Sequence, residues 1–263
     1  MKTILFATDL SVNSKHAIEY AHQLLKDIAE RYIIFYSYVD PSVGGHVSYP
    51  FEDVMNERSK EALDGFTKEL EPLLDGREVE QFVRFGDMPY AVRGILDEEN
   101  VDLIVMGSSG AGNALFGSTA YASMKELETP VLTVPLQTPV RSPARIALAT
   151  EDILTGEEPY LEPVYQLVRL HDSWLMGLRV LNERVKEKLG EVQEHAFGSD
   201  RLPYMEIDAE DPAVAIAAAV GEHEIEMLVL PLEKKGLIYR MFHRSVTKEL
   251  ASELRIPIIA LHR

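Results

Sequence analysis

A glycine-rich segment at residues 107–120, GSSGAGNALFGSTA, carries residue types that bind a phosphate. Glycine lets a backbone approach a ligand closely, and Ser118 and Thr119 add hydroxyl groups where a helix is expected to begin. Asp9, near the start of the chain, offers only acceptors and suits an adenine amino group or a ribose hydroxyl. The same residues also fit a glycine-rich turn without a ligand, with Asp9 as a helix cap, so both interpretations stay open.

Alternating strand and helix patterns place these residues at one edge of a sheet. Continuous apolar runs predict strands, and the first helix has an apolar stripe from Ala17 to Ile28, with Ser11 or Asn13 as its cap. In an open parallel sheet, ligands bind outside the carboxyl ends of the strands, where the strand order switches. The predicted strands of this half are 2–8, 31–40, 78–84, 101–107 and 131–135.

The second half of the chain repeats this pattern. Ser118 precedes Pro130 by 12 residues, and Ser245 precedes Pro257 by the same 12. We therefore predict an internal duplication and an α/β fold of two open, mainly parallel five-stranded sheets with flanking helices. The predicted domains are 1–138 and 145–263, joined by a proline-containing linker at 139–144; the repeated segments are 145–152, 173–181, 211–231 and 255–261.

Both halves resemble the universal stress protein family, so the chain is similar to a tandem member with two such domains. The motifs that carry the resemblance are ILFATDLS, VD at 39–40, GDMPYAV at 86–92, and VDLIVMGSSGAG…FGST followed by TPVLTVP. The family fold has five mainly parallel strands, as in the adenine-nucleotide alpha-hydrolase-like proteins. Its ATP-binding members carry the pattern Gly-x2-Gly-x9-Gly-Ser/Thr and an Asp after the first strand.

The resemblance implies a nucleotide site in the first half. Asp9 would face the adenine or ribose, and three residues would lie near the base: Ala7, Thr8 and Val39. The ribose and phosphates would be bound by Met106, Gly107, Gly110, Gly117, Ser118 and Thr119. Six residues, not nine, separate Gly110 from Gly117, so the loop is three residues short of the family pattern and its ligand could be ATP, ADP or AMP.

The second half departs from the family pattern in another way. Pro231, Lys234 and Arg244 stand in place of the glycines, and Glu151 corresponds to Asp9. A proline and two long cations should block close backbone approach, so we predict that this half binds no ATP in the family manner. The replaced loop is basic and fits either an anion site or a solvated loop; its cations are Lys234, Lys235, Arg240, His243, Arg244 and Lys248.

Composition excludes other classes of function. The chain has 26 Lys and Arg against 43 Asp and Glu, a net charge of −17, which disfavours nucleic acid and anionic membranes as partners. It has no cysteine and no HExxH motif, so we expect no metal site. The N-terminus ends its apolar run at Asp9, too early for a signal peptide, and a cytoplasmic location is expected.

Three functions follow from this sequence. The first is an adenine-nucleotide-binding stress or signalling protein with its ligand in residues 1–138. The second is a module without nucleotide, in which the final strands of the two halves pair into an internal pseudo-dimer for a protein partner; a homo-dimer is also compatible. The third, an enzyme, is disfavoured because no general base accompanies the phosphate loop, and slow ATP hydrolysis is the most we expect. Trp174 and the strand tyrosines are expected in the core.

Overall fold

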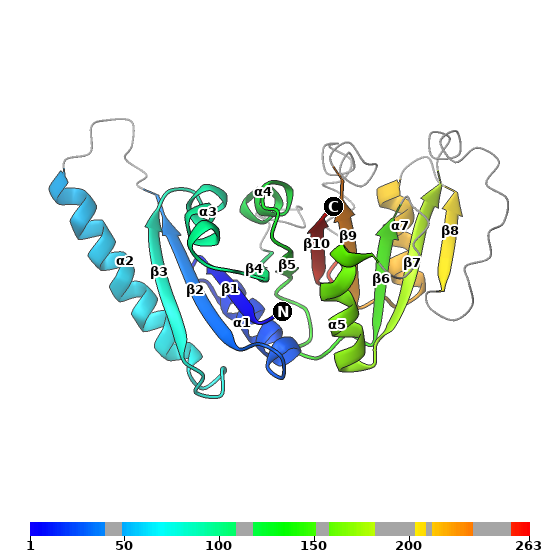
Figure 1. Cartoon of the computed structure of the whole chain (residues 1–263), viewed down its shortest axis with the longest axis horizontal. Coiled ribbons are helices and arrows are strands. Elements are labelled where there is room, and N and C mark those ends of the chain that lie inside the picture. Colours follow the sequence, from blue (N-terminus) through cyan, green and yellow to red (C-terminus); the bar gives the residue numbers. More distant parts are fainter. Residues whose placement is uncertain (40–48, 109–117, 151–157, 182–202, 209–211, 234–253) are drawn as a thin grey trace. The chain divides into compact units, whose positions relative to one another are not determined.

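The computed structural model describes residues 1–39, 49–108, 118–150, 158–181, 203–208, 212–233 and 254–263 (Figure 1). The described chain divides between Val140 and Arg141 into two compact units. This division falls inside the expected 139–144 linker. We call residues up to Val140 the first unit and residues from Arg141 the second unit.

The first unit is a parallel five-stranded sheet in the order β3-β2-β1-β4-β5. Its strands lie within one residue of their predicted ends, except that β2 and β4 are each two residues shorter at one end. β1 is central, and its Ala7 is level with Phe35 on one side and Met106 on the other. The strands are β1 (Thr3–Thr8), β2 (Arg31–Tyr38), β3 (Val79–Phe85), β4 (Leu103–Gly107) and β5 (Val131–Val134).

Helices cover both faces of this sheet, which is why its inner strands are continuous apolar runs. Figure 1 shows α3 and α4 side by side on one face and α1 on the other. The predicted stripe of α1 is buried from Ala17 to Leu25, and Ser11, not Asn13, is its N-cap. Pro89 stands in the first turn of α3, where its missing N–H costs nothing. The helices are α1 (Val12–Leu25), α2 (Tyr49–Leu70), α3 (Met88–Glu98) and α4 (Ser118–Glu126).

A buried polar cluster joins α1 to the amino end of β2. His22 Nε2 donates to the Asp75 carboxylate at 3.2 Å, and Nδ1 lies 3.0 Å from the Tyr32 hydroxyl. The Arg77 guanidinium lies over the Tyr32 ring, 4.8 Å from its centroid. Burial raises the pKa of Tyr32 to about 12. The cluster fixes the turn after α2 against the first helix.

The second unit has the same strand order, β8-β7-β6-β9-β10, and its neighbouring strands are parallel. The register also corresponds, because Ile146 in β6 is level with Met227 in β9 as Ile4 in β1 is with Leu103 in β4. Strand β8 was not predicted from the sequence. The elements are β6 (Arg145–Thr150), a 3₁₀ turn (Pro159–Leu161), α5 (Glu162–His171), β7 (Trp174–Leu181), β8 (Tyr204–Asp208), α7 (Pro212–Glu222), β9 (Met227–Leu232) and β10 (Ile258–His262).

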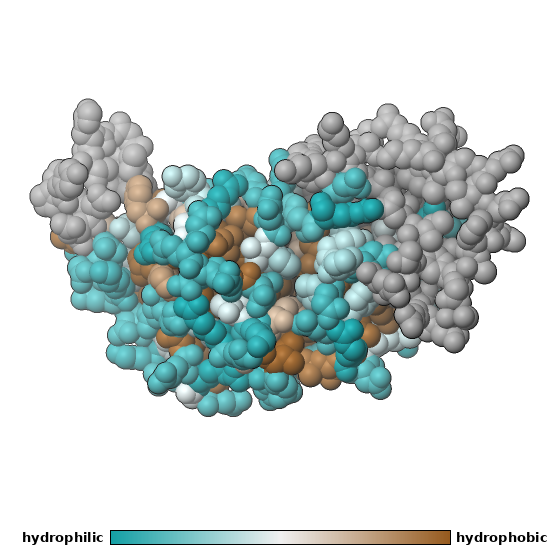
Figure 2. Space-filling view, in the orientation of Figure 1, coloured by the Kyte–Doolittle hydropathy of each residue, from teal (hydrophilic) through white to brown (hydrophobic). Residues whose placement is uncertain are grey.

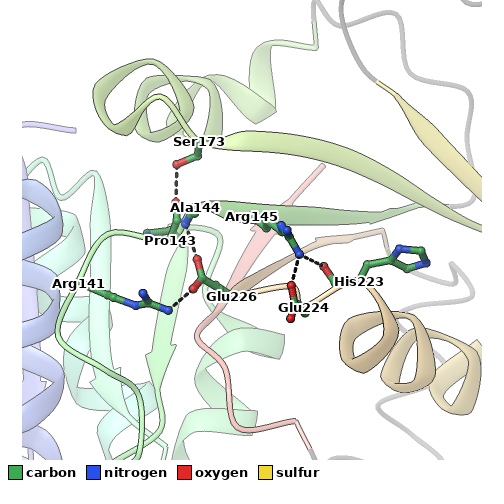
Figure 3. A network of polar contacts seen from close by, with 8 residues as sticks. All are labelled: Arg141, Pro143, Ala144, Arg145, Ser173, His223, Glu224 and Glu226. Carbon is green, nitrogen blue, oxygen red and sulfur yellow. Dashed lines mark hydrogen bonds and ion pairs between the residues drawn. The ribbon is translucent and has the colours of Figure 1, made fainter.

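Polar contacts fix the first residues of the second unit (Figure 3). The Glu226 carboxylate accepts from the backbone N–H of Ala144 and pairs with Arg141. The Ser173 hydroxyl donates to the carbonyl of Pro143 at 2.6 Å. Residues 141–144 therefore belong structurally to the second unit and not to a free linker.

Arg145, the first residue of β6, extends this network. Its Nη1 donates to the carbonyl of His223 at 3.0 Å and pairs with the Glu224 carboxylate at 2.6 Å. Glu224 has a positive φ of 51°, in the turn that leads from α7 to β9. The pair holds this turn against the start of β6 (Figure 3).

Among the described residues, no helix is both long enough and apolar enough to cross a membrane.

Candidate functional site

The residues predicted for a ligand meet at the carboxyl ends of β1 and β4. These two strands are neighbours, with Ala7 level with Met106. The chain runs from β1 outward to β2 and β3 and then returns to β4 on the other side, so the strand order switches between β1 and β4. This is where an open parallel sheet leaves room for a ligand. Ala7, Thr8, Asp9, Met106 and Gly107 all lie at this switch point.

Thr8 organises the turn that leaves β1. Its buried hydroxyl lies 2.7 Å from the Ser14 hydroxyl and accepts from the backbone N–H of Leu10 at 2.9 Å. Leu10 has a φ of 62°, a left-handed conformation that is uncommon outside glycine and asparagine. The Thr8 hydroxyl is thus engaged within the turn, and we assign it to the turn's geometry, not to direct binding.

Asp9 is exposed at the tip of this turn and is not the cap of α1. One carboxylate oxygen, Oδ1, accepts from the backbone N–H of Ser11 at 3.1 Å. The cap is Ser11, whose hydroxyl accepts from the backbone N–H of Ser14 at 3.2 Å. The interpretation of Asp9 as the helix cap is therefore wrong. This hydrogen bond uses one carboxylate oxygen, and a carboxylate has acceptor sites for further bonds.

Gly107 lies directly against the side chain of Asn13. A Cβ at this position would lie 2.3 Å from Asn13 Nδ2 and 2.9 Å from Asn13 Cγ. Carbon atoms do not approach nitrogen this closely, so any side chain at 107 would displace Asn13. Packing within the first unit therefore requires a glycine at 107, and the predicted contact of Gly107 with a ribose or phosphate stays a prediction.

Asn13 and Ser108 were not assigned to the site from the sequence. Each is only 8% exposed, and among the described residues neither Asn13 Oδ1 nor Ser108 Oγ has a hydrogen-bond partner. An unsatisfied buried polar group costs about 1–3 kcal/mol, so such groups mark places where water or a ligand is expected. Two signals in the sequence could have identified them. Asn13 stands in the first turn of the helix that follows the first strand, and Ser108 directly follows Gly107 at the end of another strand.

The predicted phosphate residues are only partly described. Gly110 and Gly117 lie outside the described residues. Ser118 is the first residue of α4, and Thr119 is exposed in its first turn, where its carbonyl accepts from the Ser123 hydroxyl at 2.8 Å. Helix α4 therefore begins where the phosphate-binding N-terminus was predicted, one short segment after β4.

Val39 lies one strand further along the same edge. It follows β2 and is 58% exposed. The carbonyl of Tyr38 accepts from the backbone N–H of Gly86 at 2.9 Å, which holds the ends of β2 and β3 together. Thr8 is level with Tyr36, so Val39 stands further out along this side of the sheet than Asp9 does.

A sequence profile described as the universal stress protein family matches residues 1–135, which is just over half of the chain. The chain belongs to the universal stress protein family. No curated protein matches it.

Solved structures of universal stress proteins share the fold over the whole chain. One from Archaeoglobus fulgidus is 22% identical, with a TM-score of 0.72, and the match covers 99% of this chain and 96% of that one. One from Pseudomonas aeruginosa is 14% identical, with a TM-score of 0.61, covering 100% and 93%. A shorter universal stress protein, solved in complex with cAMP, is 24% identical over 51% of this chain and 96% of its own, with a TM-score of 0.38.

The second unit of this universal stress protein has different residues at the corresponding edge. Pro231 in β9 is level with Leu261 in β10, as Gly107 in β4 is level with Val134 in β5. Glu151 and the basic residues 234–248 lie outside the described residues. No group of three metal-ligating side chains occurs among the described residues.

Proposed function

We propose that this universal stress protein binds one adenine nucleotide in its first unit and acts as a cytoplasmic stress or signalling protein. The observation that carries the proposal is the position of Asp9 beside Gly107 and the start of α4, at the switch point between β1 and β4. Asp9 supplies acceptors for the ribose or adenine, and the N-terminus of α4 supplies donors for the phosphates. The shortened 110–117 loop makes AMP, ADP and ATP the ligands to compare.

We propose that the second unit is a degenerate copy of the same domain and binds no nucleotide. Its strand order and register repeat those of the first unit. Pro231 supports the loss of binding because its ring replaces the backbone N–H and the open space of a glycine. In this proposal the second unit serves as a scaffold for the first.

A second function, a protein-interaction module without nucleotide, is favoured by one observation. Asn13 fills the space over Gly107, so this glycine is explained by packing inside the first unit and needs no ligand. The glycine of the family motif would then be retained for packing and not for ligand binding.

Calorimetry with ATP, ADP and AMP separates the two functions. The protein is first purified, precipitated with acid, and its released small molecules analysed by mass spectrometry. One nucleotide per chain supports the proposal, two per chain would contradict the inactive second unit, and no nucleotide and no heat would favour the interaction module.

The variant that tests the site is Gly117→Lys, which places a long side chain where the phosphates should lie. We expect binding to be lost while the thermal unfolding midpoint stays within a few degrees of the parent. The matched control is Gly94→Lys, because Gly94 is helical with no atom within 4 Å of its Cβ position, so this change adds the same charge to open space. Unchanged affinity in Gly117→Lys would remove the proposed site.

A further inference from the structure

Two aromatic side chains at the junction of β3 and α3 are exposed, and neither belongs to the candidate site at β1 and β4. Phe85, the last residue of β3, is 50% exposed, and Tyr90, in the first turn of α3, is 69% exposed. With Val39 they form an apolar surface that we call the aromatic rim. Figure 2 shows apolar surface close to the carboxyl ends of β2 and β3.

The backbone fixes the position of both rings. Gly86 lies between them with a φ of +125°, and its Cβ position would be 3.6 Å from Tyr90 Cδ1, so the tyrosine ring lies over the glycine. Phe85 is supported from one side by the buried Tyr38 ring, with centroids 5.7 Å apart in an edge-to-face arrangement. A supported ring with one open face is suited to stacking against a flat ligand.

The aromatic rim lies at the edge that carries the candidate site. β3 is two strands from β1, and strands are about 4.8 Å apart, so the rim lies roughly 10 Å from the end of β1. A nucleotide whose phosphates lie at α4 and whose ribose lies at Asp9 has its base on the β2 side, because β4 and β2 flank β1. The base of such a nucleotide would therefore lie at the aromatic rim.

The size of the rim argues against a protein partner. Large aromatic side chains bury about 150–250 Å² each, so these half-exposed groups offer roughly 300 Å². A stable protein interface needs about 800 Å² from each partner. A purine base, in contrast, is covered by one or two aromatic rings.

We propose that Phe85 and Tyr90 form the wall on which the purine base of the ligand stacks, next to Val39. This proposal rests on nucleotide binding in the first unit. The second unit has no such wall, because the pair at the register of Tyr38 and Phe85 is Leu181 and Asp208. Phe85 and Tyr90 are therefore specificity-determining residues that favour a purine over a ligand without a base.

The test compares AMP with ribose 5-phosphate, which has the same sugar and phosphate but no base. Base–aromatic stacking predicts that Phe85→Ala binds AMP about 5- to 50-fold more weakly, with Tyr90→Ala at the lower end, while the affinity for ribose 5-phosphate stays unchanged. Phe85→Leu keeps apolar contact with Tyr38 but has no aromatic face, so its affinity for AMP should resemble that of Phe85→Ala. Phe85→Tyr keeps an aromatic ring and should retain the parent's affinity for AMP. The matched control is Trp174→Ala, an aromatic side chain of the second unit that is 45% exposed.

Each other outcome contradicts the proposal at a different step. If the parent protein binds AMP and Phe85→Ala binds it equally well, the stacking wall is wrong while nucleotide binding stands. An equal loss for AMP and ribose 5-phosphate would make Phe85 a structural residue. If the parent binds neither AMP nor adenosine, as followed by saturation-transfer NMR of the base protons, both proposals fail. If the parent self-associates in sedimentation and Phe85→Ala abolishes this association, the aromatic rim is a contact between copies of the chain.

Discussion

The two units share a strand order and register but differ on both sides of their sheets, where the strands end and where they begin. At the carboxyl edge, the first unit has Gly107 with the Asn13 carboxamide over it, and the second unit has Pro231 at the corresponding register. At the amino edge, the first unit buries Tyr32 against His22, and the second has Leu175 at the position of Tyr32. The interior strands, by contrast, are apolar in both.

This difference separates the residues that make the fold from those that can make a function. Apolar strands and helix stripes specify the order of the sheet, and both units retain them. The ends of the strands are free to change because they do not set the order. The proposal of a nucleotide in the first unit therefore rests on the ends of its strands, where Asn13 Oδ1 and Ser108 Oγ are buried without a hydrogen-bond partner among the described residues.

The largest expected effect is at Gly107. Gly107→Ala should destabilise the first unit by about 2–4 kcal/mol, because its Cβ overlaps the Asn13 side chain. In an Asn13→Ala background the same change should cost less than about 1 kcal/mol. Denaturant unfolding followed by circular dichroism measures the free energy, and the fluorescence of Trp174, the single tryptophan, reports on the second unit.

Controls make this a test of the contact between Gly107 and Asn13. Gly94→Ala, in open space on α3, should be neutral or stabilising by up to about 1 kcal/mol. Pro231→Ala should change the free energy of unfolding of the second unit by less than about 1 kcal/mol, because it adds no Cβ and only frees the unfolded chain from the restriction of proline. A Gly107→Ala cost that persists in the Asn13→Ala background would contradict the explanation.

Tyr32 predicts a loss of stability of the first unit in alkali; burial also raises the pKa of Tyr165 in α5, so the second unit is expected to lose stability there as well. Burial raises the pKa of Tyr32 to about 12, against 10 in the unfolded chain, so its contribution is present below pH 10 and is lost as the pH rises to 12. The full loss is about 3 kcal/mol, because each of the two pKa units between 10 and 12 is worth about 1.4 kcal/mol.

The variant for this prediction is Tyr32→Phe. It should be less stable than the parent at pH 8 by about 1–2 kcal/mol, because His22 Nδ1 loses its partner, but its stability should fall less steeply between pH 10 and 12. Tyr90→Phe, at an exposed tyrosine, is the control and should follow the parent at all pH values. Parallel curves for Tyr32→Phe and the parent would contradict the assignment to Tyr32.

The smallest expected effect is at the ion pair between Arg31 and Glu80, which joins β2 to β3. The Arg31 guanidinium lowers the pKa of the Glu80 carboxyl, so the pair contributes above the unfolded pKa of about 4.5 and its contribution is lost as the pH falls. Both side chains are partly exposed, and Glu99 also pairs with Arg31. Glu80→Gln should therefore cost less than about 1 kcal/mol at pH 7, and this cost should shrink as the pH falls below 4.5 towards 3. An equal cost at both pH values would show that the effect is not ionic.

The sequence predicted most of this fold because its signals are local. The continuous apolar runs around Ile4, Ile33 and Ile104 became the inner strands, and the stripe from Ala17 onward became the buried face of α1. Two signals failed. Strand β8 is short and polar in part, so it lacks an apolar run, and Trp174 is 45% exposed although large aromatic residues are usually buried.

The sequence by itself determined the family, the duplicated strand pattern and the carboxyl edge at which Asp9, Gly107 and Ser118 lie. Only the tertiary structure decided what these residues do, because their roles depend on neighbours that are distant in the chain. Gly107 accommodates Asn13 from α1, Ser11 replaces Asp9 as the cap, and the Phe85 ring stands over Tyr38. Side-chain types and spacing identify a strand and its ends. Which side chains share the space beyond those ends is set by the packing of helices on the sheet.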